Sequence, residues 1–114
     1  MTLKAIEVEI NSFDYEGDDF DGLHFDFSDG YGYIALSRTP EEDDEFRIEK
    51  DDQAYSITAL PSNISYSLHR DELRLKLTEE IADAICTNQD LVLQFESDKK
   101  KFSNLEKVVK RIFS

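Results

Sequence analysis

The chain has 114 residues, 39% of them hydrophobic, and its 26 acidic and 13 basic residues give a formal net charge of −13. This length predicts a single domain over residues 1–114, and the charge argues against binding to nucleic acid or to an anionic membrane, because both would repel the protein. One cysteine excludes an intramolecular disulfide, and no signal peptide is visible. We expect a cytoplasmic protein with a basic partner, although acidic residues most often only maintain solubility.

The negative charge is concentrated in the first half of the chain. Residues 1–52 hold 17 acidic and 4 basic residues, a net charge of −13, whereas residues 53–114 hold 9 of each and sum to zero. Residues 99–114 even carry six basic residues and one acidic residue. Such asymmetry predicts a dedicated acidic side of the molecule.

Alternation of apolar and polar residues predicts strands through most of the chain. Ile6, Val8 and Ile10 alternate with Glu7 and Glu9, which is typical of a half-buried strand. Further alternating segments are residues 23–27, 31–37, 46–50, 54–60, 64–68, 73–77 and 91–95. The acid-rich residues 14–21 and 39–45 are predicted connections, and residues 69–72 a hairpin turn.

His24 and Asp26 are expected to face away from the apolar row of the predicted strand 23–27. Arg70 and Asp71, in the turn, are assigned to the fold and not to function, and so is Asp52, because such residues most often fix a turn through local hydrogen bonds.

Two helices are predicted late in the chain. Thr78 is a good N-cap for a short helix near residues 79–88, whose apolar stripe would bury Cys86. Ser103 and Glu106 form a capping box, which predicts an amphipathic helix near residues 104–113. Strands followed by late helices predict an α+β fold, with a curved, mainly antiparallel sheet and the helices packed on one face.

Few residues of the chain indicate catalysis or metal binding. "DDFDG" (residues 18–22) is similar to part of a calcium-binding EF-hand loop, but Gly17 and Ser28 stand where its first aspartate and its last glutamate belong. His24 and His69 lack any nucleophile or metal motif around them. We therefore expect no enzyme activity, no catalytic residue, no metal and no cofactor.

Acids beside aromatic rings suit recognition of a basic protein, because the charges steer association and the rings supply buried contact. The alternative for each residue is a solvated loop position or a core position. The candidate partner-binding residues are Asp18, Asp19, Phe20, Asp21, Tyr31, Tyr33, Glu41, Glu42, Asp43, Asp44 and Glu45.

From Tyr31 onward the order of motifs resembles the Imm10-type immunity proteins of bacterial polymorphic toxin systems. The similar stretches are "YGYIALSR", "FRIEKDDQAYSI", "SYSLHRDELRLKLTEEIADAI" and "LVLQF" before a closing helix. Asp52-Gln53 and the run from Arg70 to Leu73 match family elements, whereas "ALPSNIS" lacks the glycines often found before the hairpin. The resemblance implies a small cytosolic protein that binds and neutralises a cognate toxin domain.

Two other classes of function remain open at this stage. The chain would also suit a nucleic-acid mimic that inhibits a DNA-binding protein or a nuclease, if its carboxylates were spaced like phosphates along an extended face. The other class is a non-catalytic interaction subunit that assembles through a sheet edge. The sequence leaves the oligomeric state undetermined.

Overall fold

The protein folds as a mixed α+β domain in a computed structural model that describes residues 1–15, 18–27, 32–39 and 44–114. For residues 11–15, 18–20 and 52–54 it describes the backbone alone. The elements are β1 (Thr2–Tyr15), β2 (Asp18–Phe27), β3 (Tyr33–Arg38), β4 (Phe46–Lys50), β5 (Asp52–Ala59), a 3-10 turn (Pro61–Asn63), β6 (Ser65–His69), β7 (Glu72–Lys76), α1 (Glu79–Ala84), β8 (Asp90–Gln94) and α2 (Lys99–Ile112).

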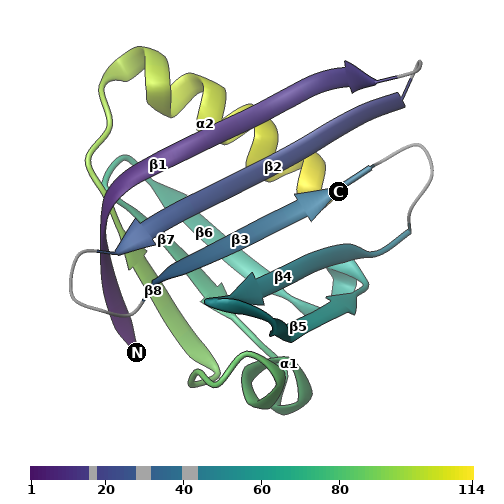
Figure 1. The fold of residues 1–114 in the computed structure, drawn as a ribbon. Coiled ribbons are helices and arrows are strands. Elements are labelled where there is room, and N and C mark those ends of the chain that lie inside the picture. The colour runs from purple at the N-terminus through teal and green to yellow at the C-terminus, as the bar shows by residue number, and fades with distance from the viewer. Residues whose placement is uncertain (16–17, 28–31, 40–43) are drawn as a thin grey trace.

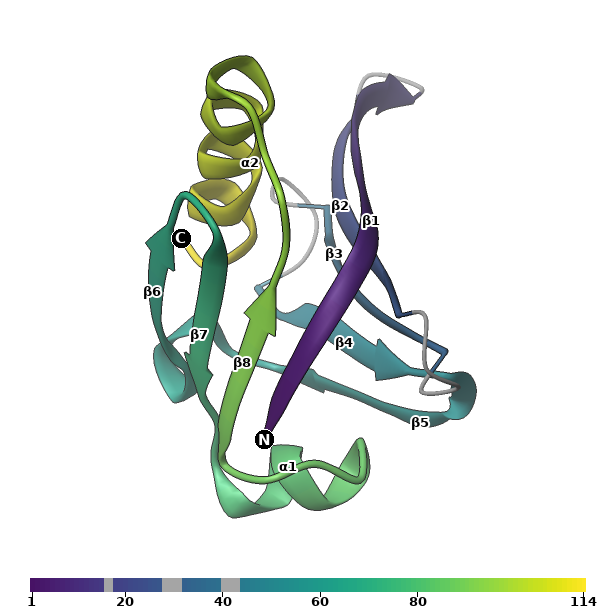
Figure 2. The ribbon, with the colours of Figure 1, turned by 90° about the vertical axis from the view of Figure 1, so that its left-hand side faces the viewer.

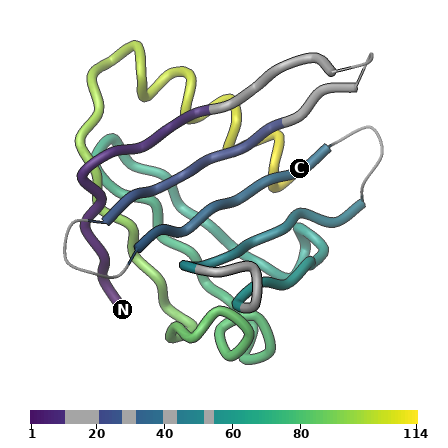
Figure 3. Tube along the Cα trace, viewed as in Figure 1, coloured from purple at the N-terminus to yellow at the C-terminus, as the bar shows by residue number. Residues whose placement is uncertain are grey.

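The strands form one strongly curved sheet in the order β5-β4-β3-β2-β1-β8-β7-β6 (Figure 1). Neighbours are antiparallel except for β1 and β8, which run parallel. The two edge strands, β5 and β6, follow each other in the chain, so the trace passes from one edge of the sheet to the other through the 3-10 turn (Figure 3). The expected α+β class with a mainly antiparallel sheet is confirmed.

Strand β1 is longer than the alternation predicted and carries a β-bulge. Its register against β2 shifts between Ala5 and Glu7, so Ile6 is 68% exposed while Ala5 and Val8 are buried. The prediction that Ile6 faces the core is therefore wrong, because the extra residue of a bulge interrupts the two-residue period. Residues 14–15 and 18–21, predicted as a connection, belong to strands β1 and β2.

Helix α1 begins as predicted and ends earlier. The Thr78 hydroxyl accepts a hydrogen bond from the Ile81 N–H at 3.2 Å. At the other end, the Thr87 N–H donates to the Ala82 carbonyl and the Cys86 N–H to the Asp83 carbonyl, which is a Schellman motif. Cys86 takes the left-handed position with φ 56° and is exposed, so the prediction of a buried thiol is wrong.

Helix α2 begins one turn before the predicted start. The Asp98 carboxylate accepts a hydrogen bond from the Lys101 N–H at 2.7 Å, which makes Asp98 the N-cap in place of Ser103. The three lysines at residues 99–101, which precede the predicted start, therefore form the first turn of the helix. Its buried stripe is Leu105, Val108, Val109 and Ile112, as the apolar spacing predicted.

The core lies between the concave face of the sheet and the helices. Figure 2 shows α2 and α1 at opposite ends of the curved sheet. α2 contacts β1, β2 and β3, and α1 contacts β5. The largest fully buried side chains are Phe25, Phe46, Leu23, Ile34, Leu36, Ile48, Leu73, Leu75, Ile85, Leu91, Leu93 and Leu105.

The C-terminal end of α2 joins two distant strands. The Phe113 ring meets the Phe46 ring of β4 edge-on at 5.1 Å and stacks on the Tyr66 ring of β6 at 5.0 Å. Arg38, at the end of β3, donates from Nη1 to the carbonyl of Ile112 at 3.0 Å and to that of Ser114 at 2.5 Å. A guanidinium at this position satisfies the last carbonyls of the helix and complements its dipole.

The predicted hairpin at residues 69–72 is confirmed. Tyr66 pairs with Leu75 and Leu68 with Leu73 in the antiparallel ladder of β6 and β7. The turn itself is held by the segment after β8, because the Ser97 hydroxyl donates to the Arg70 carbonyl at 2.6 Å. Within the described ranges, no helix has the length and apolar character needed to cross a membrane.

Candidate functional site

The convex, outer face of the sheet carries carboxylates on neighbouring strands. Along β1, Glu7 and Glu9 are exposed while Val8 between them is buried. Along β2, His24 and Asp26 are half-buried, while the apolar residues beside them lie in the core. This is the outward orientation that the alternation predicted for His24 and Asp26.

The strand register brings these side chains together. Glu7 lies opposite Asp26 and Glu9 opposite His24 across the β1–β2 ladder. Asp26 lies opposite Tyr33 on β3, and β4 adds Glu49, whose partner Ala35 is paired with His24. We call the resulting surface the acidic face, defined by Glu7, Glu9, His24, Asp26, Tyr33 and Glu49.

His24 lies between carboxylates at the centre of the acidic face. Its Nε2 is 3.3 Å from Asp26 Oδ1 and its Nδ1 is 3.9 Å from Glu9 Oε2. The Tyr33 ring packs edge-on against the imidazole, with ring centroids 4.8 Å apart. The carboxylates and the tyrosine therefore surround the ring on three sides, and the Glu9 side chain, which is 55% exposed, leaves the cluster open to solvent.

Glu49 continues the face onto β4 and has a cation beside it. Arg47 Nη2 lies 3.7 Å from Glu49 Oε2 and 3.3 Å from the Ser56 hydroxyl of β5. The ion pair is partly exposed, so it contributes little to stability and leaves most of the negative potential of the face in place.

Asp21 is not part of this surface. Its side chain is 0% exposed, and its Oδ2 lies 3.2 Å from Nε of Arg111 on α2. Asp21 was predicted to contact a partner, and this is wrong because the carboxylate is buried against the helix. Asp21 has the same strand parity as Leu23 and Phe25, so the alternation extended by one residue indicated its inward orientation.

The remaining predicted contact residues have mixed outcomes. Tyr33 lies on the acidic face, half-buried beside His24, and Asp44 and Glu45 are exposed before β4. Tyr31, Glu41, Glu42 and Asp43 lie outside the described residues, and so do the side chains of Asp18, Asp19 and Phe20. Glu7, Glu9, His24, Asp26 and Glu49 were missed as site residues, because their meeting depends on the register between strands.

The second histidine and the cysteine both lie on the surface. His69 Nε2 lies 3.2 Å from the Ser67 hydroxyl on the edge strand β6, and both side chains are exposed. A serine nucleophile needs a base that a third group orients, together with exclusion of water. Exposed positions on an edge strand do not exclude water. Cys86 follows α1 on the surface.

Among the residues that the structure describes, no group of three or more His, Cys, Asp or Glu side chains could hold a metal ion. Of the candidate calcium loop, Asp21 is paired with Arg111, and Gly17 and the Asp19 side chain lie outside the described residues.

Comparison of this chain with models of protein families, with curated proteins and with solved structures finds no match.

Proposed function

We propose that this protein is an immunity protein, which binds a basic toxin domain through the acidic face and has no catalytic role of its own. The observation that carries the proposal is the alignment of Glu7, Glu9, Asp26 and Glu49 on one outer face of β1, β2 and β4. The resemblance of the sequence from Tyr31 onward to Imm10-type immunity proteins supports the same class.

The acidic face suits recognition because its carboxylates stand on strands. Same-face residues of a strand are about 7 Å apart and adjacent strands about 4.8 Å apart, so the sheet fixes the charges in two dimensions. A charge array that is ordered before binding loses little conformational entropy when a partner docks. The acidic contacts were predicted to lie in connections, whereas the carboxylates of the acidic face lie on strands of the sheet.

The face also offers a ring for contact. Tyr33 is half-buried beside His24, so binding would bury the rest of a side chain that is already held in place. Carboxylates around such a ring steer the encounter, while the ring supplies contact area. If the toxin is a nuclease, the same carboxylates would occupy the surface that otherwise holds phosphates, and inhibition would be competitive with the nucleic acid.

The test needs a candidate toxin, and the C-terminal domain of a multidomain protein encoded directly upstream of this chain would serve. That domain is co-expressed with this chain, growth is scored, and association rates of the purified pair are measured at about 50 mM and about 500 mM salt. A variant with Glu7→Gln, Glu9→Gln and Asp26→Asn should associate about tenfold more slowly at low salt, with a smaller difference at high salt.

The matched control neutralises three exposed acids away from the face, with Glu80→Gln, Asp83→Asn and Asp90→Asn. The control has the same net charge as the acidic-face variant, so it separates placement from total charge. Equal association rates for the two variants would contradict the proposed site, and lack of rescue by the wild type would contradict the proposed function.

A further inference from the structure

Strand β1 has an open edge in the middle of the sheet. On one side, β1 pairs with β2 from Ala5 to Tyr15. On the other side, it pairs with β8 only from Thr2 to Lys4. Beyond Gln94 the chain stays beside β7, since the Phe95 N–H donates to the Asp71 carbonyl of the β6–β7 turn at 3.0 Å, and its pairing with β1 ends. In the described part of β1, residues 6–10 have no strand paired on this side.

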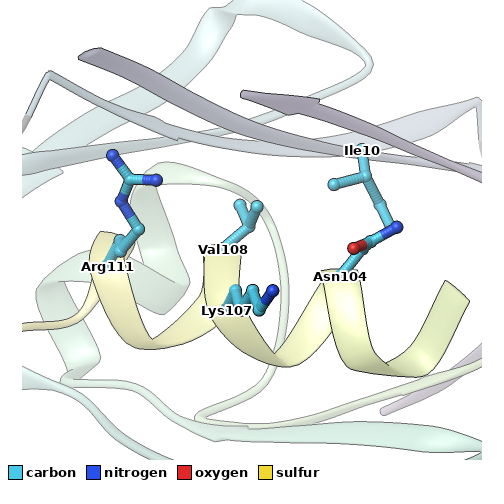
Figure 4. Close-up of a pocket in the computed structure, with 5 residues that line it drawn as sticks. All are labelled: Ile10, Asn104, Lys107, Val108 and Arg111. Atoms are coloured by element: carbon cyan, nitrogen blue, oxygen red, sulfur yellow. The ribbon is translucent and has the colours of Figure 1, made fainter. Parts of the chain in front are cut away.

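Hollows lie along the open edge. One, of about 360 Å³, is lined by Lys4, Ala5, Ile6 and Glu96, where β8 leaves β1. The next, of about 340 Å³, lies between Ile10 and the side of α2 that carries Asn104, Lys107, Val108 and Arg111 (Figure 4). Each has room for roughly ten water molecules at about 30 Å³ apiece. The edge therefore faces open space at both ends of residues 4–10.

We infer that the edge of β1 over residues 6–10 accepts an extended segment of a basic partner protein. This segment adds a strand on the side of β1 where the pairing with β8 ends at Lys4. This inference rests on the proposed function and names its mode of contact. The unpaired backbone N–H and C=O groups of an edge strand are a template for such addition, and a bound strand satisfies them.

The charges beside the edge specify the occupant. Alternate side chains of an added strand would stand on the outer face next to Glu7 and Glu9, where Lys or Arg is favoured. The intervening side chains would point inward over Ile10 and Val108, beside Lys107 and Arg111, so apolar residues are favoured there and cations are disfavoured. A second copy of this chain fits poorly, because two β1 strands side by side would place Glu7 and Glu9 of each copy among the carboxylates of the other.

The probe is a nine-residue peptide with alternating Lys and Val, blocked at both ends and added to the full chain. Amide hydrogen exchange is followed by NMR. At a peptide concentration about nine times its Kd, about one tenth of the protein is free of peptide. Exchange at those amides of residues 6–10 that point to the open edge should therefore slow about tenfold, because they exchange only in the free protein. A peptide of alternating Glu and Val, and a Lys-Val peptide with a central Pro, are the controls and should give less than a twofold effect.

A variant of the protein tests whether the peptide binds at the edge of β1 and not merely to the nearby carboxylates. Ile10→Arg places a long cation in the hollow beside Lys107 and Arg111, and should abolish protection by the Lys-Val peptide while leaving Glu7 and Glu9 intact. Ser67→Arg makes the same kind of change on the β6 edge and should leave protection unchanged.

Protection at β5 or β6 instead of β1, or binding without slowed exchange in residues 6–10, would overturn the inference. Both results are independent of the co-expression assay. Growth rescue without protection of the β1 edge would leave the proposed function standing and remove this mode of contact.

Discussion

The two halves of the chain differ in charge and in the elements they contribute. Both supply strands with buried inner faces, and only residues 53–114 add helices, yet residues 1–52 carry the whole net charge of −13 and residues 53–114 carry none. Repulsion among like charges lowers stability, and nothing in the fold of β1–β4 requires carboxylates at outer positions. In the proposed function the acidic half would supply the recognition surface. The neutral half supplies α2, the helix that covers the core and contacts β1, β2 and β3 of the acidic half.

The largest loss of stability is expected from removal of the ion pair between Asp21 in the acidic half and Arg111 in the neutral half. Asp21→Ala removes a buried carboxylate and leaves Arg111 without that partner, and should lower the free energy of unfolding by about 3 kcal/mol, toward the low end for buried pairs because Arg111 is 42% exposed. Urea unfolding gives the value. Asp26→Ala on the same strand removes a half-exposed carboxylate of the acidic face and should change stability by about 0.5 kcal/mol or less. Equal losses would show that Asp21 does not join the halves.

A second change tests the framework of the acidic half. Gly32 has φ +73°, and a Cβ there would lie 2.3 Å from Oδ1 of Asp51, which also accepts a hydrogen bond from the Tyr33 N–H at 2.8 Å. Gly32→Ala should therefore lower the free energy of unfolding by about 2 kcal/mol, as measured by thermal unfolding. In an Asp51→Ala background the clash is gone and the cost should fall to about 1 kcal/mol, the strain of the left-handed backbone. An identical cost in both backgrounds would exclude the close contact as its cause.

The neutral half contains a strained position that can be relieved. Cys86 occupies the left-handed position just after the C-cap residue Ile85, at φ 56°, where glycine has no Cβ penalty. Cys86→Gly should raise the free energy of unfolding by about 0.5 kcal/mol, whereas Cys86→Ala keeps the strain and should leave it nearly unchanged. A gain with alanine as large as that with glycine would assign the effect to the thiol instead of the backbone.

Removal of two carboxylates from β1 should change the stability least of the substitutions considered, and it tests whether the placement of charge matters. Glu7→Gln with Glu9→Gln removes two carboxylates from one face of β1 and should stabilise the protein by about 0.3 kcal/mol at low salt. The gain should vanish near 1 M salt, where the screening length is about 3 Å. Glu79→Gln with Glu80→Gln should instead destabilise α1 slightly, since those acids lie at the positive end of its dipole. Stabilisation by both pairs would mean that the total charge matters and its placement does not.

Much of the fold could be predicted from local pattern. The alternation gave the strands and the outward orientation of His24 and Asp26, and Thr78 marked the start of α1. The start of α2 was misplaced, because three lysines in its first turn oppose the helix dipole and made Ser103 the more attractive N-cap. Packing of the apolar stripe and the Asp98 cap outweigh that cost.

The candidate site was less predictable than the fold. The sequence indicated an acidic half and named Tyr33, but it assigned the acids to connections and placed Asp21 among them. Which carboxylates share a face depends on the register of β1, β2, β3 and β4, and no short-range signal in the chain encodes that register.

The sequence by itself determined the strand-rich pattern, the late helices and the division of charge between the halves, because periodicity and charge are properties of neighbouring residues. Only the tertiary structure decided that β1 pairs with β8, with the N-terminal amine donating to the carbonyl of Asp90, 89 positions away, at 2.7 Å. That long-range pairing ends at Lys4 and leaves the next residues of β1 with an open edge. Packing of α2 against β2 separately buries Asp21 beside Arg111 on the inner side. Such contacts form when the whole core packs, so no local stretch of sequence specifies them.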